Sequence, residues 1–127
     1  MALTRFSSFL YGYQVTPQNS IIFYNNVLKV VGKSAENSIA LFMLPGVSHC
    51  GGGPGPDTFD KMAAISQWVQ QGQKPARIVA SHLTGGKVDR TRPLCPFGHV
   101  AKYKGTGDTN EAANFSWAAE SMDTSGR

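Results

Sequence analysis

The chain has 127 residues, of which 41% are hydrophobic and 16% charged, and its 12 Lys and Arg residues outnumber 8 Asp and Glu. This length suits one domain with one core, and the hydrophobic share argues against an intrinsically disordered chain. No apolar run approaches the ~18 residues that a transmembrane helix needs. The 2 cysteines are too few for a disulfide-dense scaffold.

The N-terminal third of the chain predicts a short strand and a helix. The strand is expected among the first residues, which include four apolar side chains: Phe6, Phe9, Leu10 and Tyr11. Thr16 can cap a helix, and Pro17 is tolerated at its first position because Pro lacks an N–H. Apolar residues then recur at helical spacing at Tyr24, Val27, Leu28 and Val31. With Gly32 as the stop, the pattern predicts a helix over residues 17–31.

The middle of the chain predicts a buried strand, a loop and a second helix. Residues 39–44 form an unbroken apolar run, which indicates a strand with both faces buried, as in a parallel sheet. Glycine and proline dominate residues 47–56, which excludes helix and strand there. Asp57 or Thr58 is the expected cap of the second helix, and Gly72 ends it. Its predicted apolar stripe consists of Phe59, Met62, Ala63, Ser66 and Val69, widened by Ile65 and Trp68.

The last part of the chain predicts one further strand, over residues 77–82, and an irregular surface tail from Gly85 onward. Trp68 and Trp117 are interpreted as packing residues. The order helix, buried strand, loop, helix, strand is typical of an open α/β sheet. Such sheets place their chemistry at the carboxyl ends of the strands, so we expect the functional residues in the loop 47–56.

Basic residues are concentrated between positions 74 and 104, where Asp89 is the one acidic residue. A nucleic-acid site would need interleaved aromatic residues or a recognisable motif, and this stretch offers only Phe97 and Tyr103. A solvated basic surface is therefore the favoured interpretation, and no nucleic-acid partner is expected. Such a surface could alternatively bind a polyphenolic or carboxylate-bearing ligand. The candidate residues that would line the approach of this ligand are Lys87, Arg90 and Arg92.

His49, which follows the predicted buried strand, is the candidate catalytic residue. A neutral imidazole can accept a proton from a nucleophile and return it to a leaving group, although a structural or solvent-facing role is the alternative for a single loop histidine. Residues 51–55 resemble a phosphate-binding loop, but the Lys-Ser/Thr ending is absent. A cysteine interrupts the HGGG-type oxyanion motif, and no G-x-S-x-G elbow occurs.

Zinc binding is a further alternative for this loop, with His49, Cys50, Cys95 and His99 as possible ligands. The spacing of Cys95 and His99 is tolerable for zinc. The adjacent His49 and Cys50 point in divergent directions, however, and structural zinc sites favour spaced ligand pairs. No metal site is therefore predicted.

Residues 44–60, with the sequence LPGVSHCGGGPGPDTFD, resemble the histidine segment of the tannase and feruloyl esterase family. Further stretches agree with the same family: residues 15–20, 68–69 with 75–80, 90–96, 103–105 and 110–115. The resemblance covers nearly all of residues 15–115, and the HCGGGPGP string is highly specific.

The resemblance implies an α/β-hydrolase fold with a large lid. It also implies that the protein is a secreted enzyme, as in the fungi and bacteria that carry this family. It implies hydrolysis of phenolic-acid esters such as gallates and ferulates by a Ser-His-Asp triad, in which His49 matches the histidine. It also implies that Cys50 is one half of a disulfide whose other cysteine lies beside the nucleophilic serine. Such a bond would hold the base against its nucleophile. No cofactor is expected in this chain, because the calcium site of the family lies in the lid.

The chain also departs from the family pattern. No Asp or Glu precedes Glu36, so the triad acid expected shortly before Val15 is absent, and so is the Cys-Ser nucleophile segment. The cysteine that commonly follows the Ala-Asn-Phe run of the family is replaced by Ser116 and Trp117, which leaves Cys95 without that partner. A Cys50–Cys95 disulfide is a conceivable alternative, but spacing alone does not establish its geometry.

These departures lead to an expectation about the extent of the domain. We expect residues 1–127 to be the C-terminal part of an α/β-hydrolase domain, without the N-terminal part and the lid, and with two helices and two or three mostly parallel strands. The expected partners are a phenolic ester in the complete enzyme and a missing N-terminal portion, with no membrane. An extracellular location is implied by the resemblance, although the N-terminus lacks the pattern of a signal peptide. The alternative function is a catalytically inactive fragment that acts as a binding or complementation module.

Overall fold

The computed structural model describes residues 5–8, 16–49 and 51–119, with the backbone alone for 5–8. The helices of this part are α1 (Pro17–Val31) and α2 (Lys61–Gln71), with short 3₁₀ turns η1 (Lys33–Asn37) and η2 (Ala112–Asn114). Its strands are β1 (Arg5–Ser8), β2 (Leu41–Leu44), β3 (Ile78–Thr84), β4 (Lys87–Leu94), β5 (His99–Tyr103) and β6 (Phe115–Ala119). No helix in these ranges is long and apolar enough to cross a membrane.

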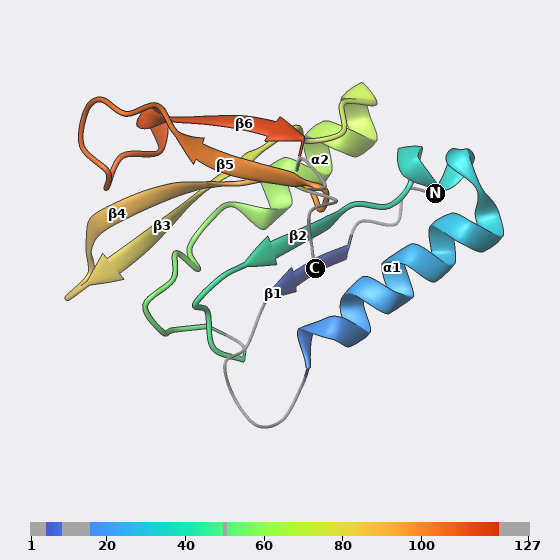
Figure 1. Cartoon of the computed structure of the whole chain (residues 1–127), viewed down its shortest axis with the longest axis horizontal. Coiled ribbons are helices and arrows are strands. Elements are labelled where there is room, and N and C mark those ends of the chain that lie inside the picture. The colour runs from blue at the N-terminus through green and yellow to red at the C-terminus, as the bar shows by residue number, and fades with distance from the viewer. Residues whose placement is uncertain (1–4, 9–15, 50, 120–127) are drawn as a thin grey trace, which may run out of the picture.

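The strands of the described part form three pairs. β1 and β2 are parallel, and α1 lies alongside them, whereas the antiparallel β3–β4 and β5–β6 hairpins lie on the other side of β2 (Figure 1). The α/β class and the predicted parallel strand are confirmed. The expectation of mostly parallel strands is wrong in detail, because only the β1–β2 pair is parallel among the described strands.

The expected irregular tail from Gly85 onward is also wrong, since β4, β5 and β6 follow that residue. Gly85 and Gly86 both have positive φ, as a two-residue hairpin turn requires, and they connect β3 to β4. The tail looked irregular in the sequence because these strands are largely exposed and carry charged residues, which conceal the alternation of a strand.

Helix α1 begins and ends where the sequence predicts. The Thr16 hydroxyl oxygen accepts a 3.4 Å hydrogen bond from the Gln18 backbone N–H, and the Gly32 N–H donates to the Leu28 carbonyl. No residue of α1 is fully buried, and its exposed apolar side chains are Ile22, Phe23, Val30 and Val31. This helix therefore presents an uncovered apolar surface in the described part of the chain.

Helix α2 differs from the prediction in its cap and its buried face. The carboxylate of Asp60, rather than Asp57 or Thr58, caps the helix by accepting a hydrogen bond from the Ala63 N–H at 2.8 Å. Trp68 is 4% exposed and Ala64 packs against the core, but Met62 and Val69 of the predicted stripe are 69% and 62% exposed. The apolar stripe of this helix is wide, and packing against the strands selects its Ala64–Trp68 edge.

The core of the described part surrounds β2. Phe42 is completely buried there, in a cluster with Ala40, Leu44, Val47, Trp68, Ile78, Ala80 and Leu94. The segment after β4 runs antiparallel beside β2, with a bridge between Phe42 and Pro96 and a 2.7 Å hydrogen bond from the Phe97 N–H to the Leu41 carbonyl. Trp68 is a packing residue as predicted, whereas Trp117 is 46% exposed. Trp117 lies on the two-stranded β5–β6 pair, which offers too little cover to bury a large ring.

Candidate functional site

The loop from Pro45 to Asp57 begins at the carboxyl end of β2 and carries His49. It closes on itself through three backbone hydrogen bonds. They run from the Gly55 N–H to the Gly46 carbonyl at 2.9 Å, from the Ser48 N–H to the Gly52 carbonyl at 2.8 Å, and from the Gly51 N–H to the Ser48 carbonyl at 3.0 Å. The expectation that this segment is neither helix nor strand is confirmed, and the hydrogen bonds give it a defined shape.

Two glycines allow the halves of the loop to approach closely. Gly53 has a φ of 95°, and a Cβ there would lie 2.5 Å from the carbonyl oxygen of Gly46. A Cβ on Gly55 would collide with the carbonyl oxygen of Pro45. The glycine-rich sequence therefore serves backbone packing in this structure.

His49 lies on the exposed side of the loop, shortly after the buried end of the strand. Val47 is 2% exposed and anchors the start of the loop in the core, while Ser48 and His49 are exposed. The imidazole therefore lies at the surface of the described part of the chain. Cys50, the expected disulfide residue, lies outside the described residues.

Asp57 holds the far end of the loop in place. Its carboxylate accepts a 2.6 Å hydrogen bond from the backbone N–H of Gly52 and a 3.0 Å hydrogen bond from the hydroxyl of Thr58. The Gly52 hydrogen bond is the main reason why the pKa of Asp57 lies below its ordinary value. The local sequence predicts Asp57 as a helix cap. Its position after a glycine-rich turn is equally compatible with a hydrogen bond from its side chain to the backbone, which is the arrangement in the structure.

The β3–β4 hairpin is attached to the same loop. Thr58 and Ser81 form an antiparallel bridge with hydrogen bonds of 3.0 and 2.8 Å. A bulge between His82 and Leu83 leaves Asp89 outside the regular pairing, and bulges of this kind change the direction of a side chain.

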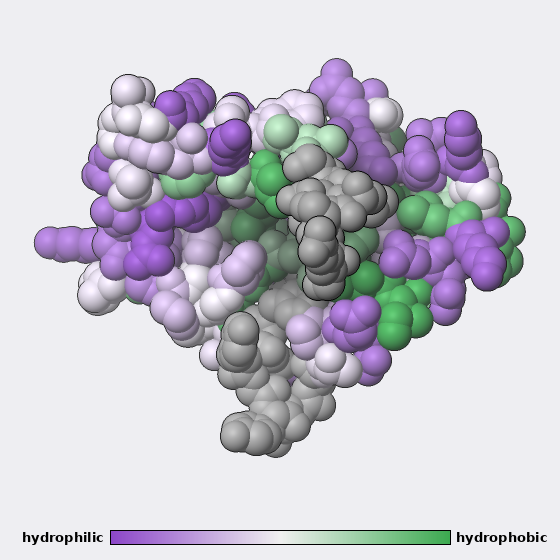
Figure 2. Space-filling model, in the orientation of Figure 1, coloured by the Kyte–Doolittle hydropathy of each residue, from purple (hydrophilic) through white to green (hydrophobic). Residues whose placement is uncertain are grey.

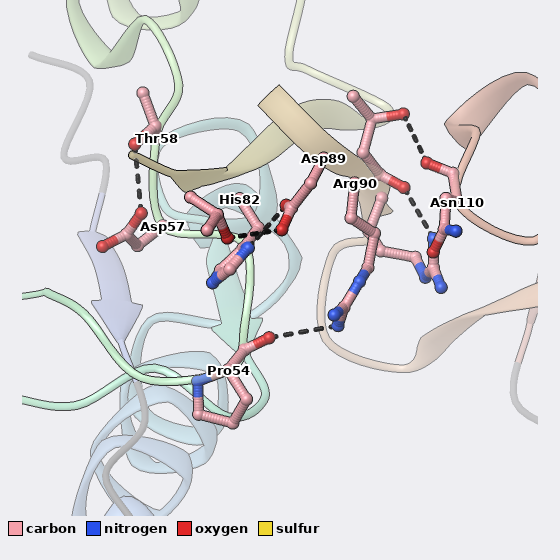
Figure 3. Close-up of polar contacts among 10 residues, drawn as sticks. Pro54, Asp57, Thr58, His82, Asp89, Arg90 and Asn110 are labelled. Carbon is pink, nitrogen blue, oxygen red and sulfur yellow. Dashed lines mark hydrogen bonds and ion pairs between the residues drawn. The ribbon is translucent and has the colours of Figure 1, made fainter. Parts of the chain in front are cut away.

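The redirected Asp89 contacts two side chains of β3. It lies 2.6 Å from His82 Nδ1 and accepts a 2.6 Å hydrogen bond from the Thr84 hydroxyl; Figure 3 shows His82 pointing toward Asp89. The hydrogen bond from Thr84 and then that with His82 lower the pKa of Asp89. Sequence analysis did not single out this cluster, because it depends on the register of the hairpin.

The structure separates the three basic residues expected at a ligand approach. Arg90 donates a 3.1 Å hydrogen bond to the Pro54 carbonyl (Figure 3), and Arg92 lies 4.7 Å from the centre of the Phe115 ring. Both arginines line a cavity of about 700 Å³. Lys87 is exposed at the β3–β4 turn and does not line that cavity.

Cys95 is a free thiol in the structure, so the conceivable Cys50–Cys95 disulfide is not formed. Burial is the main cause that raises the pKa of the Cys95 thiol, and the nearby charge of Arg77 acts in the opposite direction. Cys95 and His99 line the cavity, while His49 lies in the exposed loop. Within residues 5–8, 16–49 and 51–119, no three His, Cys, Asp or Glu side chains are placed to hold a metal ion.

A buried strand followed by a glycine-rich loop and then by a helix is the arrangement in which open α/β folds place functional residues, at the carboxyl end of the strand. A crystal structure of an esterase from Aspergillus oryzae matches 92% of this chain with a TM-score of 0.79 and 22% identity, over 27% of that esterase. Over the part that this chain spans, it therefore shares the α/β fold of that structure.

The sequence comparisons identify the family. The profile of the tannase and feruloyl esterase family matches residues 10–118. The chain is 49% identical over 82 residues to a mono(2-hydroxyethyl) terephthalate hydrolase of Piscinibacter sakaiensis, which covers 62% of this chain and 14% of that protein. It is 35% identical to a probable feruloyl esterase of Arthroderma benhamiae over 84% of this chain and 21% of that protein. The chain belongs to the tannase and feruloyl esterase family of carboxylic ester hydrolases, and it spans about a fifth or less of the length of these relatives.

Proposed function

We propose that this chain supplies the histidine of a serine esterase active site that hydrolyses esters of aromatic acids, phenolic acids in particular. The observation that carries the proposal is the exposed position of His49, in a hydrogen-bonded loop at the end of buried β2. The names of the relatives, a terephthalate monoester hydrolase and a probable feruloyl esterase, support aromatic esters as substrates.

In the proposed reaction His49 acts first as a general base and then as a general acid. Its imidazole takes the proton of the serine hydroxyl as the oxygen attacks the ester carbonyl, and then gives that proton to the departing alcohol. Water attacks the acyl-enzyme in the second half of the reaction, and His49 again receives and returns the proton. Asp57 is a positioning residue in this proposal, because it fixes the Gly52 end of the loop that carries His49.

We propose that the serine nucleophile and the acid of the triad are supplied by residues outside this 127-residue chain. The family order places the serine and the acid before the histidine, and no Asp or Glu precedes Glu36 in this sequence. A disulfide from Cys50 to a cysteine beside the serine, and an extracellular location, are proposed on the family resemblance. The 127-residue chain alone is accordingly expected to show no turnover of methyl gallate or methyl ferulate.

A chimera tests the proposed role of His49. Residues 16–119 replace the matching segment of the Piscinibacter hydrolase, with the junction at Thr16 so that residues upstream of it come from the relative. We expect this chimera to hydrolyse an aromatic ester, and His49→Ala to lower its kcat/KM by about 10⁴-fold or more. His82→Gln is the matched control, because it changes a histidine of the hairpin and should retain most of the turnover.

Two results would contradict the proposal. The first is a folded chimera that hydrolyses none of mono(2-hydroxyethyl) terephthalate, methyl ferulate and methyl gallate. The second is a His49→Ala chimera with turnover close to that of its parent. Circular dichroism of each protein shows whether it has folded, so that a loss of activity is assigned to the catalytic step.

A complementation module is the second candidate function, and the surface of α1 favours it. Val30 is 84% exposed and Val31 is 56% exposed, on a helix that also exposes Ile22 at 49%. An apolar helix face of this kind is typical of a surface that another part of a protein covers. Mixing the chain with a separately expressed N-terminal portion of the Piscinibacter relative tests this function. Restored turnover that is lost with Val30→Asp would support it, and no association of the two pieces would exclude it.

A further inference from the structure

A cavity of about 700 Å³ lies between the end of β2, the inner side of the glycine-rich loop, β4 and the start of β5. Its apolar wall comes from Met43, Pro45, Pro54, Pro56, Pro93, Leu94, Phe97 and Val100. Figure 2 shows a hollow in the centre of the molecule with hydrophobic residues at its floor. The volume falls within the ~300–1,000 Å³ that is usual for small-molecule sites.

Two arginines place positive charge in this apolar wall. Arg90 and Arg92 are two positions apart on β4, so their side chains leave the same face of the strand. In the described part of the chain, neither guanidinium forms an ion pair with a carboxylate. The pKa of Arg92 is lowered, first by burial and then by the charge of Arg90, while Asp108 acts in the opposite direction. Among the described residues, the cavity therefore brings two positive charges together with no carboxylate in contact with either.

Both guanidiniums are held at the cavity by other contacts. Arg90 uses Nη1 to donate to the Pro54 carbonyl at 3.1 Å. Arg92 uses Nη1 to donate to the Thr91 carbonyl at 2.8 Å, and its Cζ lies over the ring of Phe115, 4.7 Å from the ring centroid. A guanidinium has five N–H donors, so each arginine keeps donors for a further acceptor. Positioned in this way, the pair needs little reorganisation to receive an anion.

We propose that this cavity is a binding site for a small carboxylate attached to a planar apolar body, such as an aromatic acid. The carboxylate would accept hydrogen bonds from Arg90 and Arg92, an arrangement that guanidiniums favour because their donors match the two oxygens. The apolar body would lie on the proline, leucine and phenylalanine side chains of the wall. The two ends of the loop line the cavity but His49 does not, so the proposed site does not depend on the proposed esterase function.

Calorimetric titration of the full chain with 4-hydroxycinnamate tests the proposal. We expect saturable binding, and at least tenfold weaker binding after Arg90→Gln or Arg92→Gln, because each substitution removes charge-assisted hydrogen bonds to the carboxylate. Lys87→Gln is the matched control, because it removes one positive charge from the same hairpin outside the cavity. The neutral amide 4-hydroxycinnamamide should bind at least tenfold more weakly than the acid.

Cys95 provides a second measurement that needs no variant. Its thiol lines the cavity, so a bound aromatic acid should slow its alkylation by iodoacetamide, as followed by peptide mapping. Saturation by 4-hydroxycinnamate with Cys95 protection would support the site. Equal affinity for the acid and the amide, equal weakening by Lys87→Gln and Arg90→Gln, or binding without protection of Cys95 would each overturn it.

Discussion

The carboxylate of Asp57 accepts a 2.6 Å hydrogen bond from the backbone N–H of Gly52, and this bond joins the end of the loop Pro45–Asp57 to its centre. The bond spans the tightest part of the loop, where Gly51, Gly52 and Gly53 all have positive φ. Glycine has more backbone conformations available than any other residue when the loop is not held in place. A side chain that restrains three adjacent glycines therefore has a large effect on how well the loop keeps one conformation.

Replacement of Asp57 by Asn should weaken this restraint. We expect Asp57→Asn to lower the free energy of unfolding by about 1 kcal/mol, because a charge-assisted hydrogen bond is exchanged for a weaker neutral one. Urea denaturation measures the difference. Glu111→Gln, at an exposed residue whose side chain forms no hydrogen bond within the described part of the chain, is the control and should change the stability little. Equal stabilities of the two variants would contradict the assigned role of Asp57.

The same carboxylate predicts a dependence of stability on pH. The pKa values of Asp57 and Asp89 are lowered in the folded protein, so the unfolded chain binds more protons at acidic pH. Their contribution to stability is therefore complete above the ordinary Asp pKa of about 3.9, and it is lost as the pH falls through the lower folded values. Thermal unfolding between pH 2 and 6 measures this dependence. Asp57→Asn should flatten the acid limb, and an unchanged limb would exclude the contribution of Asp57.

Burial predicts how the free energy of unfolding responds when an apolar side chain of β2 or of α1 is truncated. Phe42 is completely buried, and Phe42→Ala should lower the free energy of unfolding by about 3–5 kcal/mol, because it leaves a cavity in the core. Val30 is 84% exposed, and Val30→Ala should change it by no more than about 0.5 kcal/mol. Chemical denaturation of the two variants provides the comparison. A large loss of stability for Val30→Ala would show that this face of α1 is covered by another part of the protein.

The environment of Cys95 predicts slow alkylation at neutral pH. Burial raises the pKa of this thiol, so less thiolate is present than in an exposed cysteine, and the thiolate is the reactive form. The positive charge of Arg77 lowers that pKa, and Arg77→Gln should therefore slow alkylation of Cys95 further. Peptide mapping after timed iodoacetamide treatment between pH 7 and 10 measures both rates. Faster labelling in Arg77→Gln would contradict the electrostatic contribution.

The features that the sequence predicted well have local causes. Thr16, Pro17 and Gly32 fix the limits of α1 because a capping hydroxyl, a missing N–H and a residue tolerant of positive φ act on adjacent residues. The apolar run 39–44 indicates β2 because few structures bury such a run on both faces. The glycine-rich histidine segment indicates the family because close backbone approach restricts which residues fit there.

The features that the sequence did not predict depend on the geometry of a turn or on the register of a strand pair, which the local residue pattern leaves open. Asp60 caps α2 because Asp57 is engaged with Gly52, and either arrangement is compatible with the local sequence. His82 and Asp89 meet because of one bulge in the β3–β4 register.

The sequence by itself indicated the family, through the resemblance of residues 44–60. It also indicated the class of fold and the location of His49 after a buried strand, because these follow from short-range patterns along the chain. Tertiary structure alone decided that Arg90 and Arg92 face a shared cavity with Cys95 while Lys87 does not, because this depends on where β4 lies against β2 and the loop. Strand pairing over long separations is selected by packing of the whole core, and no local pattern of charges or apolar residues specifies it.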